Sequence, residues 1–119
     1  MGDLFSSGES FLSYPIKVVF LKNEFSQINP AQVAFSASKR NFKLAVKRNI
    51  LKRRMREAYR LNKVQFYEGL IQKNLSVSVM FIYIGKDIAE YALIEKGMIA
   101  ALKKILLKIE NVSVDGNID

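Results

Sequence analysis

The chain has 119 residues, of which 50% are apolar and 25% are charged, and its formal net charge is +8. This length fits one domain with a single packed core. The sequence contains no cysteine and no histidine, which excludes disulfides, thiolate zinc sites and cysteine nucleophiles and removes the usual general base.

The first part of the chain predicts short strands separated by turns. Glycine suits a helix terminus, so Gly8 marks the end of a short first helix. β-branched and aromatic residues then predict a strand, and Pro15 marks a break or an edge within it. In chain order we expect a helix end at residues 3–7, a strand at 11–22, a turn at 29–30, a strand at 32–38 and a basic loop at 39–43.

The second part of the chain predicts two helices around a buried strand. We expect a helix from residue 44 to about 63 that can continue towards 70, a strand at 74–84 ended by Gly85, and a second helix. Asp87 is the expected cap of that second helix, with Glu90 as its capping-box partner. The side chains that share its apolar face are Ile94, Met98, Ala101, Leu102, Ile105 and Ile109. These elements predict an α+β fold with one domain at residues 1–110 and a frayed tail at 111–119.

The positive charge is concentrated in one segment. Residues 39–63 contain eleven basic residues and a single acid, Glu57, which gives a charge of +10, whereas the other 94 residues carry −2. A solvated helix face with alternating signs would need more acids at i±4 spacing. The asymmetry therefore favours a polyanionic partner, and nucleic acid above all.

The helix that begins near residue 44 separates into two sides at about 100° per residue. Its apolar side, expected to pack on the sheet, contains Leu44, Leu51, Met55 and Ala58. Its basic side contains Arg48, Asn49, Lys52, Arg53, Arg56, Arg60 and Lys63. The i,i+4 series Arg48, Lys52, Arg56 and Arg60, here called the basic ridge, spans about 18 Å at 1.5 Å per residue. Lys47 and Arg54 lie at the border, and Lys39, Arg40 and Lys43 add three cations before the helix.

A spaced motif runs through this segment. Ser36 and Ser38-Lys39-Arg40 end the second strand; Arg48-Asn49, Lys52-Arg53 and Arg56-Glu57-Ala58-Tyr59 follow on the helix. In order and spacing this pattern resembles the signature of the bacterial ribonuclease P protein subunit. The resemblance extends more weakly through the later strand and the last helix, so that it covers nearly the whole chain.

The resemblance implies a fold and a role. The implied fold is an αβββαβα sandwich like ribosomal protein S5 domain 2, in which a left-handed βαβ crossover carries the basic helix, an exception to the usual handedness. The implied role is that of the RNA-binding subunit of a hydrolase, an endonuclease whose catalytic centre and magnesium ions belong mainly to a large RNA. The holoenzyme cleaves precursor tRNA and releases a mature 5′ end, and the protein supplies no catalytic and no metal-binding residue.

Site residues carry over by position. For contact with the catalytic RNA they are Lys39, Arg40, Lys43, Arg48, Asn49, Lys52, Arg53, Arg54, Arg56 and Arg60. For a cleft that binds the 5′ leader of precursor tRNA they are Phe5, Lys17, Val19, Ser36 and Ser38, with Lys39 beside them; Lys17 and Val19 belong there if their side of the strand is open.

The chain departs from the family pattern in three places. Ile50 stands where the family has the third member of an Arg-Asn-Arg triplet, and Arg54 stands where it usually has an aliphatic residue. We interpret this as a cation moved one turn along the helix, which predicts equal losses of RNA binding for Arg54→Ala and Arg56→Ala. The loop at residues 41–44 is one residue longer than in many members, and the first helix is shorter.

Other functions remain open on sequence grounds. The alternative is a ribosomal or other nucleic-acid-binding structural protein without an enzymatic role, although no helix-turn-helix, RNP strand or zinc-finger spacing is present. The longest apolar run, residues 79–84, is far short of the roughly 20 residues that a bilayer helix needs, and no secretory signal opens the chain. We therefore expect a cytoplasmic protein without membrane association, monomeric within a ribonucleoprotein.

Overall fold

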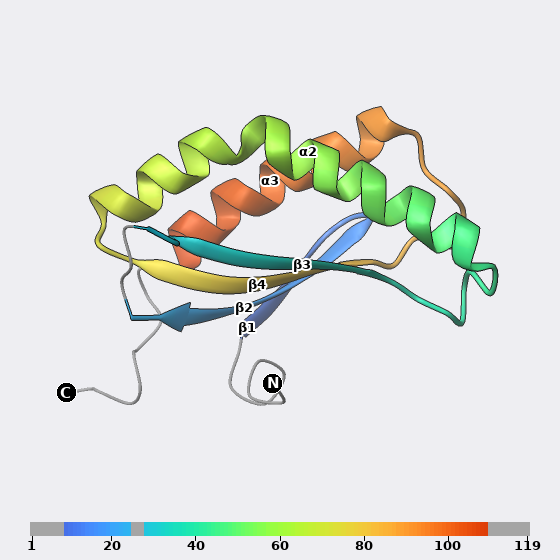
Figure 1. Ribbon diagram of the computed structural model, residues 1–119, viewed down its shortest axis with the longest axis horizontal. Helices are drawn as coiled ribbons and strands as arrows, with labels where there is room; N and C mark the ends of the chain where they lie inside the picture. The colour runs from blue at the N-terminus through green and yellow to red at the C-terminus, as the bar shows by residue number, and fades with distance from the viewer. Residues whose placement is uncertain (1–8, 25–27, 110–119) are drawn as a thin grey trace.

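The computed structural model describes residues 9–24 and 28–109, which form a four-stranded sheet with two helices on one face (Figure 1). The elements are β1 (Glu9–Ser13), β2 (Ile16–Asn23), β3 (Ala31–Ala37), α2 (Ala45–Gln72), β4 (Ser76–Tyr83) and α3 (Tyr91–Ile109). The α+β prediction is confirmed, and the described elements follow the order βββαβα. The predicted helix end at residues 3–7 and the tail at 111–119 lie outside the described residues.

The sheet has the strand order β1-β2-β4-β3, which leaves β3 at one edge. β1 and β4 both pair antiparallel with β2, whereas β3 and β4 run parallel. Parallel neighbours need a long crossover connection, and here α2 provides it. Because β3 and β4 point the same way, the loops that follow them lie at the same end of the sheet.

The single strand predicted at residues 11–22 is wrong in one respect. The segment forms two antiparallel strands, β1 and β2, joined by a turn at Tyr14-Pro15, whose peptide bond is cis. Proline has no N–H to donate to a ladder, so the break predicted at Pro15 is where the chain reverses. Ser13 pairs with Ile16 directly across this turn.

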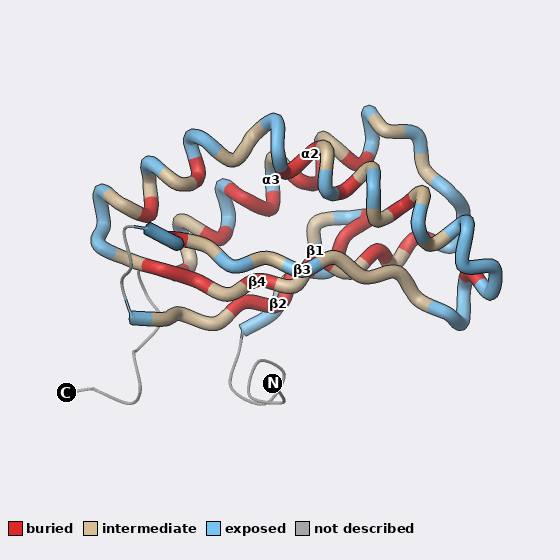
Figure 2. Tube along the Cα trace, in the orientation of Figure 1, coloured by how far each residue is buried: buried red, intermediate tan, exposed pale blue. Residues whose placement is uncertain are grey.

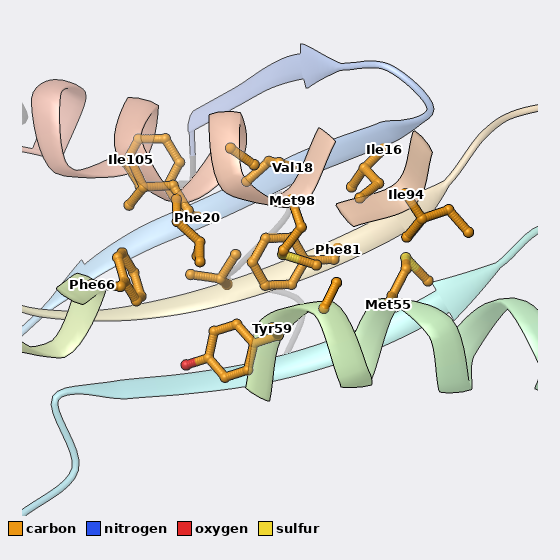
Figure 3. Packing of buried hydrophobic residues seen from close by; sticks show 14 of the residues in the cluster. Ile16, Val18, Phe20, Met55, Tyr59, Phe66, Phe81, Ile94, Met98 and Ile105 are labelled. Atoms are coloured by element: carbon orange, nitrogen blue, oxygen red, sulfur yellow. The ribbon is translucent and has the colours of Figure 1, made fainter. Parts of the chain in front are cut away.

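The hydrophobic core fills the space between the sheet and the two helices. Residues from α2, α3, β2 and β4 converge there in Figure 3. The predicted core residues of α2, Leu51, Met55 and Ala58, are fully buried, but Leu44 is 59% exposed. Leu44 precedes the first helical residue and has an extended backbone, so it does not share the orientation of the helix residues. α2 also continues to Gln72, beyond the minimum predicted.

The start of α3 also differs from its prediction. The helix begins at Tyr91, and the carbonyl of Glu90 accepts the N–H groups of Leu93 and Ile94, so the capping box at Asp87 is wrong. The preceding residues fold around Tyr83 instead. Its hydroxyl donates to the Asp87 carbonyl at 2.6 Å and accepts the Ala89 N–H at 3.0 Å. All six residues of the predicted apolar face of α3 are buried.

Candidate nucleic-acid interface

α2 presents exposed residues along the side turned away from the core (Figure 2). It contains eight basic residues and two acids, Glu57 and Glu68. Of the residues predicted to bind RNA, those on α2 are exposed (Asn49, Arg53, Arg56, Arg60) or partly exposed (Arg48, Lys52, Arg54). The structure therefore brings these helix residues to solvent with far more positive than negative charge.

Arg60 is the ridge residue with an acidic partner. Its Nε and Nη2 atoms donate to the two carboxylate oxygens of Glu57 at 3.1 and 2.7 Å. The hydrogen bond from Arg60 lowers the pKa of the Glu57 carboxyl, and the carboxylate in turn raises the pKa of Arg60. Both side chains are well exposed, so solvent screens the pair and a phosphate can compete for the guanidinium.

Arg48 joins the basic loop to the helix. Its Nη1 atom donates to the carbonyl oxygens of Phe42 and Lys43 at 2.7 and 3.0 Å. Phe42 is buried, and its ring centroid lies 5.9 Å from that of Tyr83. Arg48 therefore fixes the loop geometry in addition to carrying charge.

Ser38 organises the same loop from its other end. Its hydroxyl accepts the N–H groups of Arg40 and Asn41 at 3.1 and 3.4 Å, and its carbonyl accepts the Phe42 N–H at 3.0 Å. The basic residues of this loop, Lys39, Arg40 and Lys43, are all exposed. The turn thus holds the loop backbone in place while its cations project into solvent.

Arg56 and Arg54 lie on different sides of α2. The Arg56 guanidinium carbon is 5.4 Å from the centroid of the Phe35 ring on edge strand β3. The Arg54 Nη1 atom donates to the Ala89 carbonyl at 2.7 Å, which ties α2 to the segment before α3. Arg54 has therefore acquired a structural contact that the ridge residues Lys52 and Arg56 do not share.

Three of the residues predicted for the leader cleft, Lys17, Val19 and Ser36, fall on the sheet face opposite the helices, whereas Ser38 follows the end of β3 and its hydroxyl is bound within the basic loop. Lys17 pairs with Ile82, and Ile82 pairs with Ser36, so these three side chains form one row on the uncovered face. Val19 is on the same face but retains only 6% exposure, which leaves little surface for a ligand. Phe5 lies outside the described residues.

Sequence reasoning missed one cation near this interface. Lys86 follows β4, and together with Lys43 and Lys47 it lines a hollow at the start of α2. The parallel pairing of β3 and β4 explains its position, because the loops that follow parallel neighbours lie at the same end of the sheet. A lysine in the second loop then joins the basic residues of the first.

Similarity to known proteins agrees with this geometry. The Ribonuclease P family model matches residues 2–106. The chain belongs to the ribonuclease P protein family. The ribonuclease P protein component of Porphyromonas gingivalis is 30% identical over 102 residues, covering 86% of this chain and 74% of the relative. That of Chlorobium phaeobacteroides is 39% identical over 90 residues, covering 69% of this chain and 62% of the relative.

A solved ribonuclease P protein has the same fold. The structure of the Staphylococcus aureus RNase P protein matches with a TM-score of 0.60 and 21% identity, over 92% of this chain and 87% of that one. The mixed sheet with two helices on one face is therefore the fold of this ribonuclease P family. The basic helix lies in the crossover between the parallel strands, as the family resemblance implies.

Proposed function

We propose that the chain is the RNA-binding protein subunit of ribonuclease P and assists a catalytic RNA in removing the 5′ leader from precursor tRNA. The observation that carries the proposal is the exposed basic side of α2 in a chain of this family. Six exposed or partly exposed cations on this side face few acids. Such a surface gains binding free energy from a polyanion, because each neutralised phosphate releases condensed counterions.

The protein assists the reaction through charge. Arginine can grip a phosphate with two parallel hydrogen bonds, and cations placed between two RNA molecules reduce the repulsion between catalyst and substrate. The chain has no histidine to act as a general base, and we assign the hydrolysis, which leaves a 5′-phosphate on the mature tRNA, to the RNA partner. The protein residues bind and orient the RNA strands.

Magnesium belongs to the RNA side of this proposal. In the described parts of the chain, no group of three or more acidic, histidine or cysteine residues could hold a metal ion. The described residues therefore offer no cluster of ligands that fits a magnesium ion. We take it to be held mainly by phosphates of the RNA partner.

In this proposal, two surfaces of the protein bind different RNA strands. The ridge and the loop at residues 39–43 contact the catalytic RNA, and the open sheet face with Lys17 and Ser36 contacts the leader of the precursor. Within residues 9–24 and 28–109, neither helix is long and apolar enough to cross a membrane. We propose a single copy of the chain in a cytoplasmic ribonucleoprotein; the family match does not favour a ribosomal or other structural role.

Reconstitution tests the function. A bacterial ribonuclease P RNA is assayed for cleavage of precursor tRNA over a magnesium series, with and without the protein. We expect the protein to lower the magnesium concentration needed for cleavage. Lys52→Ala with Arg56→Ala should lose part of this effect, whereas Lys96→Ala with Lys103→Ala, which removes two exposed cations from α3, should retain it. Unchanged cleavage alongside ordinary duplex-DNA binding contradicts the proposal.

A further inference from the structure

A hollow of about 440 Å³ lies where the loop after β3 enters α2. Lys43, Lys47 and Leu44 line it from this side, and Lys86, Asp87 and Ile88 line it from the loop after β4. The volume is in the range of small-molecule sites, roughly 300 to 1,000 Å³. Neither Lys47 nor Lys86 is among the residues that the family resemblance assigns to RNA contact.

The charge of the lining selects an anion. Three exposed ammonium groups come from segments about forty positions apart, and Asp87 is the one acid among the lining residues. Lysine ammonium groups act as point charges for phosphate. The lining residues therefore carry a net charge of +2, and the concave surface strengthens the positive electrostatic potential inside the hollow.

Both walls of the hollow are held in place before any ligand arrives. Arg48 donates to the carbonyl groups of Phe42 and Lys43, and the Tyr83 hydroxyl donates to the carbonyl of Asp87. The rings of Phe42 and Tyr83 lie 5.9 Å apart beneath the two loops. Pre-organisation of this kind reduces the ordering cost of binding.

The lining also offers apolar surface. Leu44 and Ile88 are 59% and 37% exposed, and both line the hollow with the lysines. We propose that the hollow binds one nucleotide unit of an RNA strand, its phosphate between the three lysines and its ribose or base against Leu44 and Ile88. The Asp87 carboxylate accepts a hydrogen bond from the 2′-hydroxyl, which favours RNA over DNA. The inference rests on the proposed function, since it takes the polyanion to be RNA.

The first test uses adenosine 5′-monophosphate and the full-length chain. We expect NMR shift changes centred on residues 43–47 and 86–88, and at least about fivefold weaker binding in Lys86→Ala. Lys96→Ala, an exposed lysine of α3 outside the lining, should bind like the parent, and the 2′-deoxy nucleotide should bind more weakly. Shift changes centred on the ridge, or a Lys86→Ala variant that binds like the parent, overturn the proposal.

A second test separates this inference from the proposed function. Binding to a bacterial ribonuclease P RNA is measured over a salt series, and Lys86→Ala should lower the slope of log K against log salt by about 0.7, the value for one single-strand contact. If the protein fails to stimulate cleavage but binds the nucleotide through Lys86, the proposed function fails and the hollow stands. If it stimulates cleavage while Lys86→Ala changes neither nucleotide binding nor the slope, the hollow fails alone.

Discussion

Arg54 and Arg56 are two positions apart on α2, and their guanidinium groups lie on different sides of the helix. Arg56 lies over the Phe35 ring at the open edge of the sheet. Arg54 donates to the Ala89 carbonyl and joins α2 to the segment that leads into α3. Two arginines that look equivalent in the sequence therefore have different surroundings: Arg56 is exposed to solvent, and Arg54 is hydrogen-bonded to the backbone of a neighbouring segment.

The first prediction compares these two arginines. We expect Arg56→Ala to lower the salt slope of RNA binding by about 0.7 to 0.9, the range for one phosphate contact. It should change the free energy of unfolding by less than about 1 kcal/mol, because its contact with Phe35 is exposed. Arg54→Ala should lower the free energy of unfolding by about 1 to 3 kcal/mol through the lost hydrogen bond, with a smaller change in slope. Salt-series binding and urea unfolding measure both quantities. Equal slopes for the two variants would support the sequence-based view that Arg54 replaces a ridge cation.

Glu57 is the residue that limits the charge of the ridge. The second prediction is that Glu57→Gln releases Arg60 and tightens RNA binding about two- to fivefold at low salt. Since Arg60 holds the pKa of the Glu57 carboxyl below its usual value, the carboxylate stays ionised from pH 5.5 to 7.5. The pair is present above the ordinary carboxyl pKa and is lost only as pH falls through the lowered one. The gain in RNA affinity from Glu57→Gln should therefore be the same at pH 5.5 and at pH 7.5. Glu68→Gln, which removes another exposed acid of α2, is the control.

At the scale of elements, α3 is positioned by a close approach to the β1–β2 turn. A Cβ atom added at Gly97 would lie 2.9 Å from the Tyr14 carbonyl oxygen and 3.2 Å from that of Ser13. The Ser13 hydroxyl also donates to the Gly97 carbonyl at 2.8 Å. The close approach of the Gly97 backbone to the Tyr14 and Ser13 carbonyl groups fixes the distance between the helix and the hairpin, because neither backbone can move aside as a flexible side chain could.

The third prediction follows from that contact. Gly97→Ala should lower the free energy of unfolding by about 1 to 2 kcal/mol, since overpacking against backbone costs more than the roughly 1 kcal/mol that alanine gains in helix propensity. Urea unfolding measures the change. Gly69→Ala is the matched control, because its added Cβ meets the flexible end of the Leu106 side chain at 2.8 Å. A Gly97→Ala variant more stable than the parent would show that the turn moves without cost.

For the whole molecule, helical periodicity predicted α2 and α3, composition and turn residues predicted the strand segments, and long-range pairing decided the rest. The apolar stripe of α3 and the two sides of α2 follow from the 3.6-residue repeat. Composition alone does not predict that the chain reverses at Pro15, because the residues before and after this proline are equally typical of strands. The capping box predicted at Asp87 does not form, because the Tyr83 hydroxyl hydrogen-bonds to the Asp87 carbonyl and the Ala89 N–H. Lys86 lies beside the basic loop because β3 and β4 are parallel, an arrangement already contained in the βαβ crossover that the family resemblance implies.

The candidate site was predicted to a similar degree. The exposure of the α2 cations follows from helix geometry, and those predicted to bind RNA are all at least partly exposed. Their contact with RNA stays a prediction. The roles of Arg48 and Arg54 in holding neighbouring backbone could not be read from the sequence, since their acceptors depend on how the loops fold. The row formed by Lys17, Ile82 and Ser36 likewise depends on strand register across β4.

The molecule therefore has two candidate RNA surfaces separated by its own sheet. The basic side of α2 belongs to the helical layer, whereas Lys17 is exposed on the face that α2 and α3 leave uncovered. If the sheet face binds the leader, its cation contributes to the affinity for precursor tRNA and not to that for the catalytic RNA. The two affinities should then be separable by mutation.

The last prediction uses this separation. In the reconstituted holoenzyme, Lys17→Ala should weaken binding of precursor tRNA about two- to fivefold, through loss of one phosphate contact, and leave binding of mature tRNA unchanged. Affinity of the free protein for the catalytic RNA should also be unchanged, whereas Arg56→Ala should reduce it. Lys96→Ala serves as the control for the loss of one exposed lysine. If Lys17→Ala instead weakens mature and precursor tRNA equally, the uncovered sheet face does not read the leader, because mature tRNA has no leader to contact.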